Sequence, residues 1–141
     1  MISTRGRYAI RIMLDIAERA SGSPVPMKDV AKRQEISLKY IERIMPMLTA
    51  GGLVSGTHGK GGGYRLCREP SEYTVWEILT IAEGDMAPVA CLCENSEPCL
   101  RAAECRTLPM WEGYFKVTKD YFSKITLQSL MSNPTPDNYV I

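Results

Sequence analysis

The sequence predicts a mainly helical protein with a small β hairpin, built as a winged helix-turn-helix domain plus a long C-terminal dimerisation helix. Two short amphipathic stretches, residues 27–33 and 38–50, are separated by a tight turn. A glycine-rich segment, residues 55–63, then separates two short strand-like runs. Two helices followed by a hairpin are typical of a winged helix, whose second helix enters the major groove of DNA. Helix-turn-helix patterns also occur in proteins that bind no nucleic acid, so the prediction depends on the combination.

The composition is that of an ordinary globular chain with an uneven charge distribution. Apolar residues make up 45% and charged residues 23% of the 141 residues, which suits one domain or a small domain with a dimerisation extension. Residues 1–70 hold 12 Lys and Arg against 6 Asp and Glu, whereas residues 71–141 hold 5 against 10. A basic front half suits a polyanion such as DNA, although a chain this short can reach such an imbalance by chance.

The sequence contains no segment that resembles a membrane span or a signal peptide. No apolar run is long enough to span a bilayer, and the N-terminus reads as an amphipathic helix, not as a signal-peptide core. We therefore expect a cytoplasmic protein without membrane contacts. Structural disulfides are not expected in that compartment, so the spacing of the five cysteines points to metal or redox chemistry.

A first helix is predicted from a cap at Ser3 or Thr4 to about Arg19. Its apolar face should pack on the helix-turn-helix. That face comprises Tyr8, Ala9, Ile12, Met13, Ile16 and Ala17. Arg5 and Arg7, with Arg11 one turn later, fit the positive end of the helix dipole poorly. A DNA phosphate would relieve that misfit, although solvated arginines explain each position equally well.

The helix-turn-helix itself occupies residues 27–50. Met27–Arg33 forms its first helix, and Ser37 can cap the second, which Gly51-Gly52 ends. One side of the second helix is apolar, with Tyr40, Ile41, Ile44, Met45 and Leu48, and other sides carry Lys39, Glu42 and Arg43. Pro46 cannot donate to the carbonyl of Glu42, so we expect a bend or a break there.

The predicted wing joins Leu53-Val54 to Tyr64–Leu66 through a mobile glycine-rich tip. His58 and Lys60 project from that tip and can reach the minor groove or its phosphates, although a tip histidine is more often only solvated. Cys67, at the end of the second strand, is expected to be a small buried residue.

Two further helices are predicted in the rear half. Thr74 and Glu77 match a capping box for a helix that ends at Gly84, with Trp76 expected in the core. Residues 108–124 form a long helix that Pro109 can open. Its aromatic stripe needs cover from a second subunit or from the first helix of its own chain, or from both. The stripe comprises Trp111, Tyr114, Phe115, Thr118, Tyr121 and Phe122. Thr126 then caps a short helix over 127–131, before an irregular tail.

The loop between Val89 and Leu108 carries four cysteines, Cys91, Cys93, Cys99 and Cys105. Cys93, Cys99 and Cys105 are spaced with five residues between neighbouring cysteines. This spacing is wider than that of the ligand cysteines in zinc knuckles and ferredoxins. Clustered thiolates can hold zinc or an iron–sulfur cluster. By spacing alone, unligated cysteines are an equally good interpretation.

Several motifs together resemble the Rrf family of bacterial winged helix-turn-helix transcriptional regulators (IscR/NsrR-like), over residues 2 to about 131. The motifs are Ser3–Ala9 (STRGRYA), Val30–Ser37 (VAKRQEIS), Tyr40–Glu42 (YIE), Gly52–Val54 (GLV), Gly61–Tyr64 (GGGY) and Thr126-Leu127. Their order and spacing match throughout. The resemblance implies a homodimeric repressor or dual regulator whose long C-terminal helices cross to form the dimer.

The resemblance also implies site residues. Cys93, Cys99 and Cys105 match the three cysteine ligands of cluster-binding members, and Glu42 matches a glutamate that resembles a selectivity element. Ser37, Lys39, Tyr40 and Arg43 are implied at the major groove, with His58 and Gly59 at the wing tip. Three further DNA contacts are inferred from positions in the sequence and not from the resemblance: Arg5, Arg7 and Lys60.

The sequence departs from the family pattern at several positions. Arg106, Thr107 and Leu108 stand where some members have a histidine ligand, and no carboxylate precedes Asp15, so the fourth ligand is unassigned and Cys91 is a weak candidate. His58 stands where many relatives have arginine. Glu35 replaces the usual turn glycine.

We therefore predict a winged helix-turn-helix DNA-binding domain over 1–84, a cysteine-containing sensor loop over 85–107, a dimerisation helix and a short following helix over 108–131, and an irregular tail over 132–141. The protein should repress transcription as a homodimer on two operator half-sites about one helical turn, ~34 Å, apart. A [2Fe-2S] or [4Fe-4S] cluster would sense iron–sulfur, redox or nitric-oxide status. The alternative is a cluster-free regulator or interaction protein controlled by a sulfur-metabolism partner. Enzymatic activity is not expected, because His58 lies far from the loop thiols.

Overall fold

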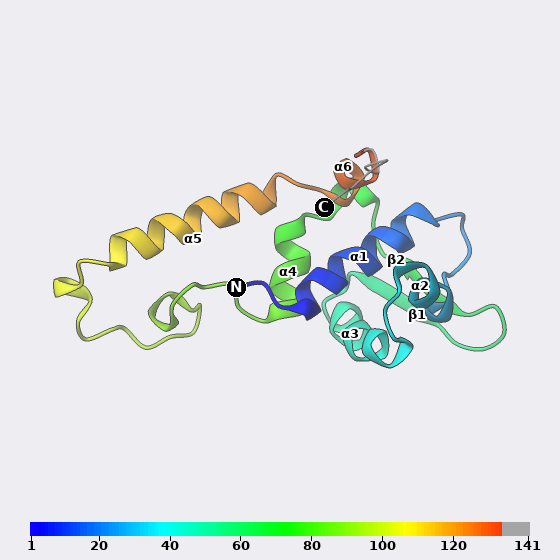
Figure 1. Cartoon of the computed structure of the whole chain (residues 1–141), viewed down its shortest axis with the longest axis horizontal. Coiled ribbons are helices and arrows are strands. Elements are labelled where there is room, and N and C mark those ends of the chain that lie inside the picture. The colour runs from blue at the N-terminus through cyan, green and yellow to red at the C-terminus, as the bar shows by residue number, and fades with distance from the viewer. Residues whose placement is uncertain (134–141) are drawn as a thin grey trace.

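The computed structural model describes residues 1–133 and confirms the mainly helical fold with one small hairpin (Figure 1). The helices are α1 (Thr4–Glu18), α2 (Met27–Gln34), α3 (Leu38–Ala50), α4 (Val75–Glu83), α5 (Leu108–Ser123) and α6 (Leu127–Met131). The strands are β1 (Val54–Thr57) and β2 (Gly63–Leu66), and three 3-10 turns are η1 (Pro70–Glu72), η2 (Ala90–Leu92) and η3 (Ala102–Glu104). Of the predicted irregular tail, residues 134–141 lie outside the described residues.

Side-chain caps start four of the helices where the sequence predicts them. The hydroxyl of Ser3 accepts from the Gly6 N–H at 3.4 Å, and that of Ser37 accepts from the Tyr40 N–H at 3.2 Å. Thr74 and Thr126 cap α4 and α6 in the same way. The capping box at α4 is only half formed, because the Glu77 carboxylate pairs with the Arg68 guanidinium at 2.7 Å.

The expected break at Pro46 does not occur, since α3 runs as one helix from Leu38 to Ala50. Pro46 lies on its exposed side, whereas Ile41, Ile44 and Leu48 are fully buried along the opposite side. Burial of each such side chain contributes about 1.5–3 kcal/mol, which outweighs one missing backbone hydrogen bond. Packing therefore keeps α3 continuous across Pro46.

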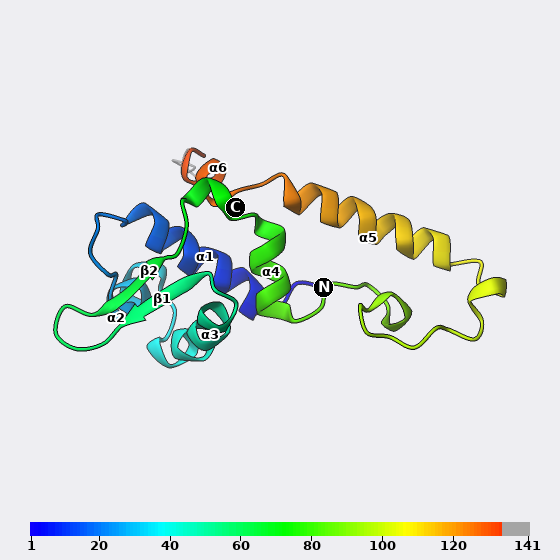
Figure 2. The same cartoon turned by 180° about the vertical axis from the view of Figure 1, so that it is seen from behind.

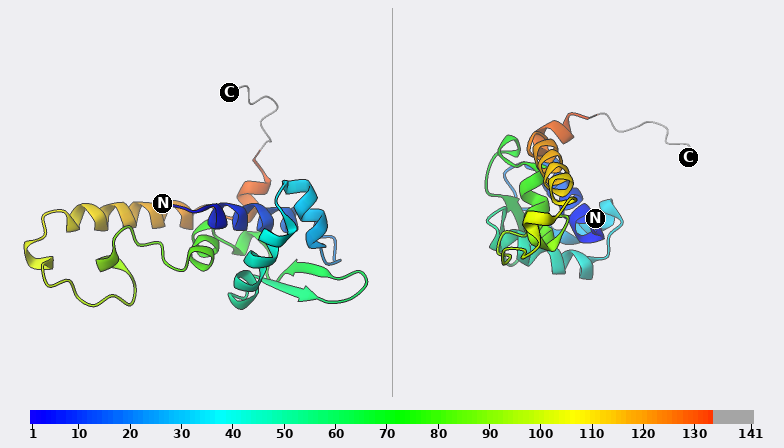
Figure 3. Two further views of the ribbon diagram at one scale, coloured as in Figure 1. Left: turned by 60° about the horizontal axis from the view of Figure 1, so that its bottom comes forward. Right: turned by 90° about the vertical axis from the view of Figure 1, so that its left-hand side faces the viewer.

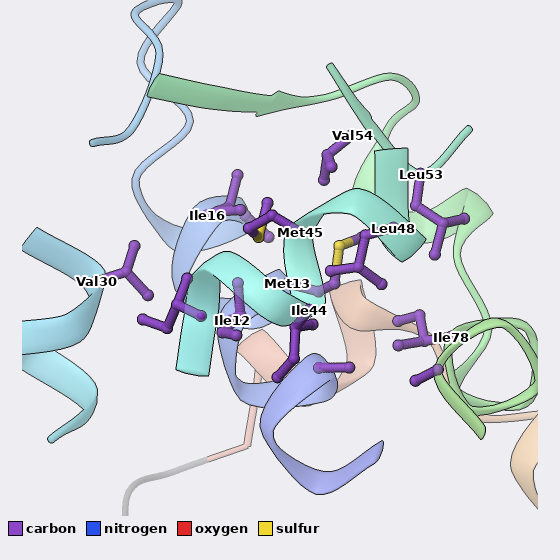
Figure 4. Packing of buried hydrophobic residues seen from close by; sticks show 14 of the residues in the cluster. Ile12, Met13, Ile16, Val30, Ile44, Met45, Leu48, Leu53, Val54 and Ile78 are labelled. Atoms are coloured by element: carbon purple, nitrogen blue, oxygen red, sulfur yellow. The ribbon is translucent and has the colours of Figure 1, made fainter. Parts of the chain in front are cut away.

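The hydrophobic core lies where α1 meets α3 and α4 (Figure 4). The α1 side chains Ile12, Met13 and Ile16 pack against the buried face of α3, which confirms the predicted apolar stripe. Leu127 of α6 is fully buried in the same cluster. α1 is thus a central helix that α2, α3, α4 and α6 all contact.

The hairpin pairs β1 with β2 in antiparallel register, from Val54 opposite Leu66 to Thr57 opposite Gly63. Val25, in the loop before α2, forms a second bridge with Tyr64 through N···O contacts of 2.8 and 2.9 Å. Gly63 has φ +155°, and a Cβ there would collide with the backbone of Val25. This close approach explains the third glycine of the GGGY motif.

The hairpin and α5 extend from opposite ends of the molecule (Figures 1, 2 and 3). α5 packs against α4, and Phe115 of α5 lies on Trp76 of α4 with ring centroids 5.8 Å apart. Two expectations are wrong here: Trp76 is only half-buried, because it faces the exposed α5, and Cys67 is exposed, because it lies just beyond the end of β2. Within residues 1–133, no helix combines the length and the apolar character that crossing a bilayer requires.

Candidate nucleic-acid interface

The outer face of α3 presents the predicted major-groove residues to solvent. Lys39, Glu42 and Arg43 are exposed, and Ser37 is exposed as the helix cap. Tyr40 is half-buried, because its ring packs edge-on against Tyr8 of α1 with a centroid distance of 5.4 Å. These side chains can therefore reach a ligand while the buried face of α3 stays fixed to the core.

A groove of about 430 Å³ separates α3 from the hairpin. Glu42 and Pro46 line it from α3, and His58 and Gly59 line it from the hairpin tip. Lys28, at the start of α2, also lines this groove. The structure thus brings Glu42 and His58 to one concave surface, as the winged-helix interpretation expects.

Lys28 is a candidate contact that sequence reasoning missed. It lies in the first turn of α2, whose N-cap residue Pro26 forms no side-chain capping hydrogen bond. The free N–H groups and positive dipole of a helix N-terminus attract phosphate. A basic residue two positions after the proline at a helix start could have indicated this position.

Asp15 orients the helix-turn-helix, a role that the sequence pattern did not reveal. Its carboxylate is 98% buried, since its exposed fraction is 2%. It accepts from Arg33 Nε at 3.1 and 3.2 Å and from Gln34 Nε2 at 2.8 Å. Arg11 also donates to the side chain and to the backbone carbonyl of Gln34. The hydrogen bond with Asp15 raises the pKa of Arg33. The end of α2 is therefore fixed to α1 immediately before the turn.

The two predicted arginine contacts lie at the start of α1, away from the groove. The Arg5 guanidinium approaches the carbonyl of Glu83, at 3.5 Å, and Arg7 donates to Thr4 at 3.0 Å. The Glu83 carboxylate accepts from both the N–H and the hydroxyl of Ser3, at 2.9 and 2.8 Å. Glu83 thus joins the end of α4 to the start of α1.

The loop cysteines are spread along a segment that contains two short 3-10 turns, η2 and η3. Cys91 is in η2 and is exposed, and Cys93 follows it, half-buried. Cys99 is exposed, and Cys105 follows η3, half-buried. Desolvation, with the nearby Asp85, raises the pKa of Cys93. Hydrogen bonds from Thr107, whose hydroxyl lies 3.5 Å from the sulfur, lower the pKa of Cys105.

These thiols do not form a metal site in the arrangement described. Among residues 1–133, no three His, Cys, Asp or Glu side chains converge as ligands of one ion. Three soft thiolates have the right chemistry for an iron–sulfur cluster, but their positions in one subunit do not fit it. A cluster would require the loop to rearrange.

Comparison with known proteins extends the match to nearly the whole chain. The sequence model of Rrf2, described as an iron-dependent transcriptional regulator, matches residues 2–133. The HTH-type transcriptional regulator IscR of Vibrio vulnificus is 37% identical over 140 residues, which span 99% of this chain and 80% of that protein. IscR of Serratia proteamaculans is 35% identical over 132 residues, 94% of this chain and 79% of that one.

Solved structures agree with the sequence relatives. CymR, described as the global cysteine regulator of B. subtilis, superposes with a TM-score of 0.75 at 32% identity, over 94% of this chain and 96% of that chain. T. potens IscR gives a TM-score of 0.71 at 28% identity, over 93% and 85%. A chain that folds this way and matches the family from residue 2 to residue 133 belongs to the Rrf2 family of DNA-binding transcriptional regulators, and so is not an enzyme.

Proposed function

We propose that α3 enters the major groove of an operator while the hairpin tip reaches the neighbouring minor groove. The shared groove between Glu42 and His58 is the observation that carries this proposal, because it puts α3 and the wing on one face. Ser37, Lys39, Tyr40 and Arg43 then face the major groove, with Glu42 as a selective acceptor for a cytosine amino group. Gly59 and Lys60 approach the minor groove beside His58. Arg5 and Arg7 contact flanking phosphates.

We further propose that two copies pair through α5. Met110, Tyr114, Val117 and Tyr121 are between 55% and 69% exposed along one side of this helix. Large apolar side chains in a continuous exposed stripe mark an interface. In this proposal residues 1–84 bind DNA, residues 85–107 sense the signal and residues 108–131 dimerise, and the homodimer represses transcription by occupying the promoter.

Substitutions on α3 test the DNA contacts. Lys39→Ala and Arg43→Ala should each weaken binding, and each should lower the slope of log K against log salt by about 1 if the side chain contacts a phosphate. Lys124→Ala removes the same charge at the end of α5 and serves as the control. Fluorescence anisotropy with a duplex selected from a random pool measures both quantities. Parent-like binding by both variants would place the DNA-contacting surface elsewhere.

The loop of residues 85–107 is the proposed site of regulation. Three thiolates within this loop, together with the family description as iron-dependent, support a [2Fe-2S] or [4Fe-4S] cluster at Cys93, Cys99 and Cys105, with Cys91 as a further donor. Anaerobic purification followed by ultraviolet–visible absorption and iron and sulfide analysis tests it. A colourless, iron-free sample with intact thiols after anaerobic reconstitution would reject the cluster and leave DNA binding intact.

A cluster-free regulator is the second candidate. The separated positions of the thiols favour it, as does the similarity to CymR, which covers 96% of that chain and is described as a cysteine regulator. In this case a protein of sulfur metabolism would bind the loop or α5 and change DNA affinity. Co-purification of such a partner, with neither iron nor zinc in the sample, would distinguish this candidate from the first.

A further inference from the structure

Tyr73 is a fully buried tyrosine at the junction of the hairpin, η1 and α4. Its hydroxyl donates to the carbonyl of Leu53 at 2.7 Å and accepts from the N–H groups of Cys67 and Arg68, both at 2.9 Å. Burial raises the pKa of this phenol, so it stays protonated and can donate at neutral pH. One hydroxyl therefore satisfies three backbone groups.

Those three backbone groups close the base of the wing. Leu53 immediately precedes β1, whereas Cys67 and Arg68 immediately follow β2. Within the described residues, these three groups share one direct backbone hydrogen bond, from the Cys67 N–H to the Leu53 carbonyl. At 3.3 Å it is long. A two-stranded hairpin is marginally stable by itself, so its anchoring points decide where an exposed tip lies.

The backbone around Tyr73 is fixed to the segment that follows α5. The Tyr73 carbonyl accepts from the Leu127 N–H at 3.1 Å, and the Val75 N–H donates to the Ile125 carbonyl at 2.8 Å. A bridge between Thr74 and Thr126 lies between these two bonds. The residue that closes the wing is thus also joined to the segment between α5 and α6.

Arg68 reinforces this connection. Its guanidinium lies 4.4 Å from the centroid of the Tyr73 ring, donates to the Glu72 carbonyl at 3.2 Å and pairs with Glu77 at 2.7 Å. Tyr73 is therefore held from its ring, its hydroxyl and its backbone. It touches neither α3 nor the exposed tip residues in any hydrogen bond that the structure records between residues 1 and 133.

We propose that Tyr73 is a positioning residue for DNA binding, which sets the wing relative to α4 and to the α5–α6 junction. This inference rests on the proposed contact between the wing tip and DNA. It makes the placement of the wing depend on the same backbone contacts that hold the segment between α5 and α6, and so joins DNA recognition by the wing to the arrangement of the dimer.

A double-mutant cycle between Tyr73 and Lys60 tests the inference. Tyr73→Phe keeps the ring and removes only the hydroxyl. In the parent protein, Lys60→Ala should weaken binding to a duplex selected from a random pool and lower the salt slope by about 1. In the Tyr73→Phe background, Lys60→Ala should lose more than about half of that effect, because the wing no longer holds its place.

Lys39→Ala provides the matched control, since it removes a lysine from α3 and not from the wing. Its effect should be the same in both backgrounds, whereas a general loss of folding would diminish both lysine effects alike. An equal Lys60→Ala effect in both backgrounds would overturn the positioning role. If Lys60→Ala has no effect in the parent, both the positioning role of Tyr73 and the proposed wing contact are wrong. The proposal that α3 enters the major groove would then still be tested by Lys39→Ala.

Glu77→Gln covers the case in which Tyr73→Phe does not fold. It removes the ion pair that holds Arg68 over the ring, it is partly exposed, and it leaves all basic residues in place. The same cycle with Lys60→Ala should show a reduced lysine effect. A full lysine effect in Glu77→Gln, with Tyr73→Phe unfolded, would count against the proposal.

Discussion

Asp15 is the residue on which the geometry of the helix-turn-helix depends most directly. Its buried carboxylate binds Arg33 and Gln34 at the end of α2. Asp15→Asn removes the charge and leaves Arg33, which is about a third exposed and can be hydrated. We expect the free energy of unfolding to fall by about 2 kcal/mol, below the range for fully buried pairs.

Urea denaturation of the Asp15→Asn protein measures this loss. Glu18→Gln, one turn later on the same helix, neutralises an exposed carboxylate and should leave the midpoint unchanged. If both variants lose the same small amount of stability, the Asp15 contacts do not hold α2. The sequence offered no signal for this role, because a single aspartate in an amphipathic helix is usually exposed.

The loop thiols should differ in reactivity, because their pKa values move in opposite directions. Hydrogen bonds from Thr107 lower the pKa of Cys105, so its thiolate fraction at pH 7 exceeds that of an ordinary thiol. Desolvation raises the pKa of Cys93, so that thiol stays protonated to higher pH. Iodoacetamide labelling of reduced, metal-free protein, followed by peptide mass spectrometry, should modify Cys105 before Cys93.

The pH dependence and one variant check the cause of that order. Labelling of Cys105 should begin at lower pH than labelling of Cys93, and the gap should narrow at alkaline pH, once Cys93 ionises as well. Thr107→Ala removes the hydroxyl and should slow Cys105 at pH 7 without changing Cys93. Faster labelling of Cys93 at pH 7 in the unmodified chain would contradict the assignment.

At the scale of elements, local sequence signals located the helices and the hairpin because each begins or ends with its own chemistry. Ser37 and Thr74 cap their helices through their hydroxyls, and Gly63 permits the close approach of Val25. The signals failed where tertiary contacts decide. Pro46 predicted a bend or a break, and the packed side of α3 keeps the helix unbroken. Trp76 was predicted in the core, but it is only half-buried against Phe115 of α5.

The turn between α2 and α3 contains the one non-glycine residue with positive φ among residues 1–133, Glu35 at +54°. A left-handed conformation costs a side-chain-bearing residue about 1–2 kcal/mol. Glu35→Gly should therefore be more stable than Glu35→Ala by roughly 1 kcal/mol, after allowing for the greater entropy of glycine in the unfolded chain.

Thermal and urea unfolding of these two Glu35 variants test the strain. Both variants lose the same carboxylate, so the difference between their free energies of unfolding reports the cost of the backbone conformation. Equal stability would mean that the turn relaxes to negative φ in solution. The departure of this position from the usual turn glycine was visible in the sequence, but its conformation was not, because glutamate rarely adopts it.

For the whole molecule, the sequence predicted how the α3 and wing-tip residues lie relative to one another, but not how the loop thiols lie, and the reason is physical. Glu42 and His58 meet because a helix, a turn and a hairpin of standard geometry bring them together. Cys93, Cys99 and Cys105 lie on a segment with only short 3-10 turns, whose path depends on contacts and ligands that spacing does not encode. The sequence therefore shows that the loop carries several thiols, but it does not show where these thiols lie relative to one another.

The rear of the molecule has an apolar surface that a second subunit would cover. The exposed side of α5 and the N-terminal residues Met1 and Ile2 line a groove of about 660 Å³. Tyr114, Val117 and Tyr121 form one wall of it. Since α5, which forms one side of this groove, extends away from the wing (Figure 1), two copies can pair there while both DNA-binding faces stay free.

Val117→Asp should separate the subunits, because a charge placed in the centre of an apolar interface loses its hydration without gaining a partner. Sedimentation velocity at micromolar concentration should change from a dimer to a monomer, and operator affinity should fall by at least ~10-fold, since one half-site then binds alone. Ser123→Asp adds the same charge to α5 away from the stripe and should remain dimeric. If Val117→Asp stays dimeric and binds its duplex as the parent does, the subunits pair through another surface. The wing and α3 would then have to reach two half-sites from a different arrangement.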